Sequence, residues 1–301
     1  MSILRKSQEW GWWLHDLEQA IGPIVSGRTY VIAGRPSCGK TMFLQNLAWQ
    51  LSLRMEGDPV MLMSWTERGE EPALISLASL IDGLNENLCL RQKWNELPDG
   101  SERKIEERVQ GFRDTADMFP ILDVACPTSD EIYYALQRHK PSIFIFDYLQ
   151  NVTPMPGQTD WGAIYAAMGH CTEYAKNGGT VFIGSQLKRR GDGIYDKYRP
   201  PHMDDFLGGG KIEAGANVAL GLYRPLKPMT LSDEKEVKAG RRDLEQWKQH
   251  GVMGVKVLKH TFAGDAADRI VRVKVLDNRR VVDYEYREPI VDRGDAWEAP
   301  F

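Results

Sequence analysis

Short apolar runs recur along the chain, separated by longer segments in which apolar residues return every three or four positions. The short runs are typical of buried strands, and the longer segments are typical of amphipathic helices. Strands are predicted at residues 28–33, 59–64, 119–124, 142–146, 180–184 and 218–223. Helices are predicted between them at residues 40–55, 70–84, 91–117, 129–139 and 161–176.

A doubly wound, mostly parallel sheet is the arrangement that this order of elements predicts. Buried strands that alternate with helices form α/β domains in which the helices cover both faces of the sheet. Residues 255–258 and 270–275 alternate apolar and polar positions and are expected to add late antiparallel strands. Residues 186–216 are rich in Gly, Pro and charged side chains and are expected to form loops.

One large domain fits the length of the chain, because 301 residues suffice for a single α/β core. The expected division is a short N-terminal linker and helix at 1–20, the α/β domain at 21–285 with a charged helical insert at 225–252, and a C-terminal tail at 286–301. Near the N-terminus, Trp10, Trp12 and Trp13 favour packing into the core, with a contact between subunits as the alternative.

Composition is that of an ordinary globular protein, with 42% hydrophobic and 27% charged residues. No apolar run approaches the roughly 20 residues that span a bilayer, and the N-terminus has no apolar signal core. The four cysteines are scattered without a CxxC pair, which disfavours a zinc site and indicates a reduced compartment. We therefore expect a cytoplasmic protein without a membrane partner. The net charge of −4 requires that any contact with nucleic acid come from local basic loops.

Residues 34–41 read GRPSCGKT and match the pattern G-x-x-x-x-G-K-[ST] without a gap. The pattern lies between a predicted strand and a predicted helix, which is the context of a phosphate-binding loop. In such a loop, backbone N–H groups surround phosphate oxygens, the lysine reaches the terminal phosphates and the hydroxyl ligates Mg²⁺. The sequence therefore predicts a site for ATP and Mg²⁺ formed by Gly34, Arg35, Pro36, Ser37, Cys38, Gly39, Lys40 and Thr41.

Three further residues are expected at the same edge of the sheet. Asp147 ends an apolar strand and could hold the Mg²⁺ through water. Glu67 follows another strand and could orient the attacking water, although a charge at the start of the next helix is its alternative role. Gln186 follows a third strand and could sense the terminal phosphate, a weak signal by itself.

Positive charge follows directly on this last strand, at Lys188, Arg189 and Arg190. Loops after strand ends lie on the side of the sheet that carries the phosphate loop. Basic side chains there would neutralise the nucleic-acid backbone without reading its sequence. A solvated basic loop is the alternative interpretation.

Several of these segments together resemble the motor domain of DnaB-like replicative helicases. Residues 33–41 resemble the ARPSMGKT loop of that family, residues 64–67 its FSLE strand, residues 146–150 its IDYLQ segment and residues 185–189 its SQLNR segment. Residues 205–213 and 222–224 are similar to its DLRESGSIE and LYR segments, and residues 257–265 to the VLKNRFTGD segment of related phage and mitochondrial ring helicases.

This resemblance implies a RecA-like P-loop NTPase that hydrolyses ATP to move on single-stranded DNA in replication. It further implies a hexameric ring with ATP at each subunit interface, and a primase or helicase loader as a possible partner. The location would be the bacterial cytoplasm, or the host cytoplasm for a phage protein. In this family pattern Lys40, Thr41 and Asp147 bind nucleotide and Mg²⁺, Glu67 activates water, and Gln186 links the terminal phosphate to the DNA loops.

The resemblance also implies two cations at the terminal phosphate, Arg224 and Lys259, with Lys259 supplied by a neighbouring subunit. A DNA phosphate would be held by a loop made of Gly208, Gly209, Gly210 and Lys211.

Two departures from the family keep other functions open. The arginine finger of the family falls on Thr261, and its DNA-loop arginine falls on Leu207. Arg269 or Arg272 could replace the finger, or Lys259 could act alone. A low-turnover loader or regulatory ring is therefore one alternative, and a RecA- or RadA-like recombinase is a second.

Overall fold

The computed structural model describes residues 8–54, 59–64, 70–115, 121–123, 126–189, 198–207, 209–227 and 229–285. The strands are β1 (Glu9–Trp10), β2 (Ile24–Val25), β3 (Thr29–Gly34), β4 (Val60–Ser64), β5 (Ile121–Asp123), β6 (Ile143–Asp147), β7 (Thr180–Gln186), β8 (Val218–Tyr223), β9 (Val252–His260), β10 (Ile270–Val275) and β11 (Val281–Asp283). The α-helices are α1 (His15–Ile21), α2 (Lys40–Ser52), α3 (Glu70–Ile81), α4 (Glu86–Leu90), α5 (Ser101–Asp114), α6 (Ser129–His139), α7 (Asp160–Lys176), α8 (Gly210–Gly215) and α9 (Leu231–Lys238).

A nine-stranded sheet forms the centre of the described chain, in the order β11-β10-β9-β8-β3-β7-β6-β4-β5. The six strands from β8 to β5 run parallel, while β9, β10 and β11 are added antiparallel. This confirms the predicted mostly parallel sheet with late antiparallel strands. Because parallel strands end at one edge, the last residues of β3, β6, β7 and β8 lie side by side there.

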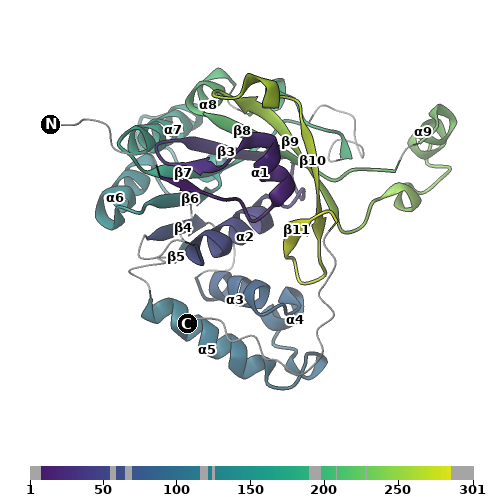
Figure 1. Ribbon diagram of the computed structural model, residues 1–301, viewed down its shortest axis with the longest axis horizontal. Coiled ribbons are helices and arrows are strands. Elements are labelled where there is room, and N and C mark those ends of the chain that lie inside the picture. The colour runs from purple at the N-terminus through teal and green to yellow at the C-terminus, as the bar shows by residue number, and fades with distance from the viewer. Residues whose placement is uncertain are drawn as a thin grey trace.

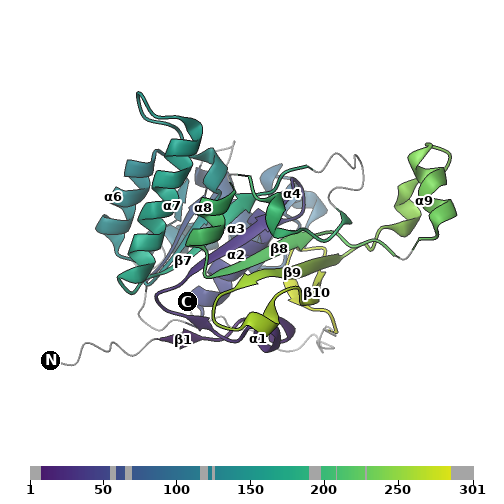
Figure 2. The same cartoon turned by 90° about the horizontal axis from the view of Figure 1, so that it is seen from above.

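Helices cover both faces of the sheet, α2 and α3 on one side and α6, α7 and α8 on the other (Figures 1 and 2). Alternate residues of β3 explain the two layers. Tyr30 and Ile32 belong to the buried cluster that contains α2 residues such as Leu44. Val31 and Ala33 belong to the opposite cluster with α6 and α7. The predicted continuous apolar strand thus supplies both cores at once.

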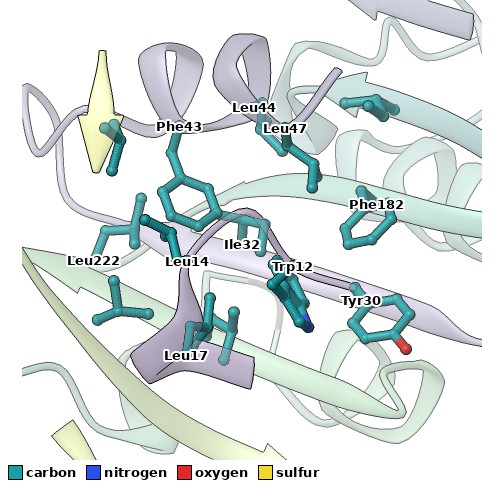
Figure 3. Close-up of a cluster of buried hydrophobic side chains, with 14 of the residues drawn as sticks. Trp12, Leu14, Leu17, Tyr30, Ile32, Phe43, Leu44, Leu47, Phe182 and Leu222 are labelled. Atoms are coloured by element: carbon teal, nitrogen blue, oxygen red, sulfur yellow. The ribbon is translucent and has the colours of Figure 1, made fainter. Parts of the chain in front are cut away.

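The segment before β3 packs into the first of these cores (Figure 3). Trp12 is 5% exposed and makes edge contacts with Tyr30 and Phe182 at ring-centroid distances of 6.1 and 5.9 Å. Trp13 contacts Phe43 and donates from Nε1 to the Val281 carbonyl at 2.7 Å. Core packing, the favoured interpretation of these two tryptophans, is confirmed.

Three elements differ from the sequence prediction. The charged helix expected at 91–117 begins at Ser101, because Pro98 and Gly100 interrupt it, and α4 precedes it. The segment 186–216, expected to be loops, contains α8. This helix packs on α7 so closely that a Cβ added at Gly215 would lie 2.6 Å from Met168 Cε.

The insert at 225–252 contains the short α9 and a 3-10 turn at Leu244–Trp247 rather than a continuous helix. It extends away from the sheet (Figures 1 and 2). Val237 and Leu244 bury Tyr198 in a separate small cluster, in which Tyr198 is 8% exposed. The insert therefore holds the end of the segment that follows β7.

No helix in the described residues is long and apolar enough to cross a membrane.

Candidate nucleotide site

The predicted phosphate loop connects the end of β3 to the first turn of α2, as the motif requires. Gly39 has φ 99° and precedes α2, a left-handed conformation that favours glycine. A Cβ at this position would lie 3.1 Å from Arg224 Nη2 and 2.8 Å from Met253 Cε. The guanidinium of Arg224 therefore lies against the phosphate loop of its own chain.

Lys40 lies within the cradle, where its Nζ donates to the carbonyl of Gly34 at 2.9 Å and to that of Arg35 at 3.4 Å. Burial lowers the pKa of Lys40, and the nearby carboxylate of Asp147 partly offsets this. The ammonium is thus a weakly hydrated cation, which an incoming phosphate would stabilise strongly.

Asp147 and Thr41 supply oxygen ligands of the kind that Mg²⁺ prefers. Asp147 is 2% exposed and accepts a hydrogen bond from the Thr41 hydroxyl. Burial raises the pKa of this carboxyl group, while Thr41 and Lys40 lower it. Among the described residues, Asp147 Oδ1 has no hydrogen-bond partner. A buried, unpartnered carboxylate oxygen beside a hydroxyl fits a Mg²⁺ site, and the described residues contain no cluster of three or more His, Cys, Asp or Glu side chains that would favour another metal.

Gly184 of β7 makes this position of Asp147 possible. A Cβ added there would lie 2.8 Å from Asp147 Oδ1 and 3.1 Å from Leu44 Cδ1. Any side chain at Gly184 would therefore displace the carboxylate or the helix α2.

Replacing Gly184 with alanine should raise the Mg²⁺ concentration for half-maximal ATP hydrolysis by roughly tenfold, because the carboxylate must turn away from its position. Titration of the hydrolysis rate with Mg²⁺ at saturating ATP measures this shift. Gly169→Ala is the matched control, since a Cβ at Gly169 would meet nothing within 4 Å. An unchanged Mg²⁺ requirement in Gly184→Ala would show that Asp147 does not hold the metal.

Lys259 lies far from the phosphate loop of its own chain. It pairs with Ala219 of β8, which pairs with Val31 of β3, three residues before Gly34. Its Nζ donates to the carbonyl of Glu213 at 2.7 Å. Lys259 therefore lies toward the opposite edge of the sheet.

Thr261, at the position of the family's finger, follows Lys259 on that edge and donates from its hydroxyl to the Asn217 carbonyl at 3.0 Å. The two arginines considered as replacements lie elsewhere. Arg269 is paired with Asp265 at 2.8 Å, and Arg272 lies opposite Gly254, whose other neighbour is Tyr223 at the phosphate-loop end.

Gln186 ends β7, which lies between the phosphate-loop strand β3 and the Asp147 strand β6. Its backbone N–H donates to Gln150 Oε1 at 2.8 Å. The Nε2 of Gln150 donates to Ser185 Oγ at 3.1 Å and to the Leu207 carbonyl at 3.4 Å. Sequence reasoning gave Gln150 no role, although its place three residues after Asp147 was a usable signal.

The side chain of Arg35 turns away from the cradle, so that only its backbone faces the phosphate position. The side chain is buried and donates to the carbonyls of Lys188 and Arg199 at 3.2 Å each. It also forms an ion pair with Asp205 at 3.0 Å. Asp205 was not predicted as a site residue, because its partner is 170 residues distant in the sequence.

The predicted DNA-binding residues lie after β7 and around the start of α8. Lys188 and Arg189 are exposed. Lys211 is exposed at the start of α8, with its Nζ 4.6 Å from the ring centroid of Tyr165. Gly209 and Gly210 form the turn into this helix. Glu67, Arg190 and Gly208 lie outside the described residues.

Comparison with known proteins agrees with this geometry. Residues 13–261 match the family model of the DnaB-like helicase C-terminal domain. One solved structure, the ATPase domain of another DnaB-like replicative helicase, is similar with a TM-score of 0.66 and 21% identity, over 86% of each chain.

A second solved DnaB-like replicative helicase, described with its interactions with primase, is similar with a TM-score of 0.62 and 20% identity. This match covers 90% of the present chain and 61% of the helicase. Likenesses at this identity support the RecA-like fold, and a search of the curated proteins finds no match. Because the family model spans most of the chain, the protein belongs to the family of DnaB-like helicase C-terminal domains and is an ATP-dependent helicase.

Proposed function

We propose that this helicase domain works as a homohexameric ring that hydrolyses ATP with Mg²⁺ to move along single-stranded DNA. The supporting observation is the direct attachment of exposed basic residues to the phosphate loop. The N–H of Leu187 donates to the Gly34 carbonyl at 3.2 Å, and Arg35 Nε donates to the Lys188 carbonyl at 3.2 Å. A shift of the phosphate loop on nucleotide binding would therefore move Lys188 and Arg189.

The nucleotide roles follow from the contacts described above. Lys40 would bind the terminal phosphates, and Thr41 and Asp147 would hold the metal. Bound Mg²⁺ bridges phosphate oxygens and neutralises the charge that develops during transfer. Arg224 is the cation available from the same chain. Glu67 remains the proposed base that orients the attacking water.

A ring is proposed because Lys259 cannot reach the phosphate loop of its own chain. A head-to-tail contact with a second copy would bring Lys259 to that copy's nucleotide. Such heterologous contacts close into cyclic assemblies when their rotation permits. A lysine supplied by a neighbour would stabilise charge on the departing phosphoryl group.

The proposed DNA contacts are phosphate contacts. Lys188, Arg189 and Arg190 would neutralise the backbone, and the turn of Gly208, Gly209, Gly210 and Lys211 would hold a phosphate with backbone N–H groups. Such contacts carry no sequence preference.

Reversing Lys188, Arg189 and Arg190 to glutamate should weaken single-stranded DNA binding by at least an order of magnitude and flatten its salt dependence, because three cations are lost. Fluorescence anisotropy of a labelled oligonucleotide over a range of salt concentrations measures both effects. Hydrolysis without DNA should persist. A DNA affinity that does not move would place the DNA contacts outside this segment.

Two broader aspects remain proposals. The similar replicative helicase is described with primase, and we propose a primase or a helicase loader as the partner of this chain. We also propose that it acts in the cytoplasm, where replication takes place.

The test of the motor function combines ATP hydrolysis and DNA unwinding. Hydrolysis should rise on addition of single-stranded DNA, forked DNA should be unwound, and particle images with an ATP analogue should show closed six-fold rings. Thr261 in place of the family's arginine favours one alternative, a low-turnover ring. Tight ATP binding with little hydrolysis and no unwinding would support that alternative, and filaments instead of rings would support a recombinase.

A further inference from the structure

One buried side chain of the phosphate loop holds both ends of the segment at residues 188–205. Arg35, 2% exposed, donates to the carbonyls of Lys188 and Arg199 and pairs with Asp205. Asp205 is itself 3% exposed and also accepts from the backbone N–H of His202 at 2.9 Å. A guanidinium has donors in a fixed fork, so that these partners cannot move independently of one another.

The two ends of the segment are also joined to each other. The N–H of Lys188 donates to the Asp205 carbonyl at 2.6 Å, and Leu187 forms an isolated antiparallel bridge with Phe206. Phe206 is fully buried beneath them. The exposed basic residues therefore rise from a closed base that is fastened to the phosphate loop.

Gln150 fastens the same base to the metal-binding strand. It lies just beyond Asp147, accepts from the N–H of Gln186 and donates to the carbonyl of Leu207. Its amide thus spans β7 and the return of the loop. The phosphate loop and the Asp147 strand hold this segment from two sides, through Arg35 and Gln150.

We propose that Arg35, Gln150 and Asp205, here named the coupling cluster, are positioning residues that make the nucleotide site respond to single-stranded DNA. This inference rests on the proposed function. DNA bound at Lys188 and Arg189 would shift the base of the segment, and the coupling cluster would carry that shift to the phosphate loop and to Asp147. None of the three side chains needs to touch nucleotide or DNA for this role.

A stabilising role alone explains the coupling cluster less well. A buried ion pair contributes little net stability, because the desolvation of both charges offsets their attraction. What the pair specifies is a single relative position of the phosphate loop and the basic segment. Loss of that position should appear in the coupling of two ligands rather than in the binding of either one alone.

Asp205→Asn and Gln150→Glu test the proposal in the full-length chain. The first removes the charge that pairs with Arg35 but keeps an acceptor for the His202 N–H. The second keeps an acceptor for the Gln186 N–H but removes the donor to the Leu207 carbonyl. Asp268→Asn is the matched control, because it neutralises the partner of buried Lys256, at 2.9 Å, in a pair that does not join the nucleotide site to the basic segment.

Two ratios are measured for each protein: ATP hydrolysis with and without a thymidine oligonucleotide, and the affinity for a non-hydrolysable ATP analogue with and without that oligonucleotide. Coupling is reciprocal, so the oligonucleotide affinity must change with the analogue by the same factor. In Asp205→Asn and Gln150→Glu both ratios should fall by at least about fivefold, with hydrolysis in the absence of DNA kept within about twofold. Asp268→Asn should match the wild type.

Ratios that remain at the wild-type level in either folded variant would overturn the coupling role, even if the melting temperature falls. If Asp205→Asn does not fold, Gln150→Glu decides alone, because it removes no charge partner. A wild-type chain without any DNA stimulation would overturn the proposed function and the coupling role together. Stimulation in the wild type that survives in the variants would overturn the coupling role only.

Discussion

Replacing Lys40 with alanine should reduce ATP hydrolysis by about 10²–10³-fold or more, which in practice abolishes it. Its ammonium is the only lysine charge that the described phosphate loop places inside the cradle, where Nζ lies 2.9 Å from the Gly34 carbonyl. Removing it leaves the terminal phosphate without its main cation from the same chain. Phosphate release at saturating ATP, with and without single-stranded DNA, measures the loss.

The fold should survive this substitution. Burial lowers the pKa of Lys40, which means that the folded chain holds the charged lysine at a cost to stability. The melting temperature of Lys40→Ala should therefore match or exceed that of the wild type. Lys176→Ala, at an exposed position in the last turn of α7, is the control and should leave hydrolysis unchanged. Hydrolysis at the wild-type rate in Lys40→Ala would refute the phosphate-loop assignment.

Replacing Lys259 with alanine should lower the DNA-stimulated turnover number by at least tenfold, because arginine fingers in other nucleotide hydrolases contribute about 10³–10⁵ and Lys259 is the proposed cation in that role. Thr261→Arg should leave turnover unchanged or raise it, since it restores the family's finger two residues later on the same side of the strand. Turnover numbers at saturating ATP and DNA decide between these outcomes.

Mixed rings separate action on a neighbour from action within one chain. Lys40→Ala and Lys259→Ala subunits should each be nearly inactive alone. Mixed together, they form interfaces in which an intact phosphate loop meets an intact Lys259, so that part of the activity should return. No recovery in well-mixed rings would argue against a lysine supplied by the neighbour.

Full activity of Lys259→Ala, with loss of activity in Arg269→Ala or Arg272→Ala, would mean that another residue acts as the finger. The structure makes both arginines weaker candidates. Arg269 is held by Asp265 and by the Ala20 carbonyl, and Arg272 lies near the phosphate-loop end of the sheet.

Local sequence alone determined most of the elements and the core of the nucleotide site. The helix at 129–139 was predicted with its bounds as observed, because Thr128 and Glu131 form a capping box within four consecutive residues. The phosphate loop was equally predictable, since the phosphate cradle is built from eight adjacent residues whose backbone geometry their own identities set. Asp147 followed from an apolar strand that ends in an acid.

Only the tertiary structure decided how these parts are connected. The position of β7 between β3 and β6 depends on the pairing of strands from distant parts of the chain. The direction of the Arg35 side chain depends on Asp205, and the burial of Tyr198 depends on Val237 of the insert. Such contacts join residues far apart in sequence, and the energy that selects them comes from burial and from shared hydrogen bonds. No periodicity or motif within either segment records that energy, so it became visible only when the chain was folded.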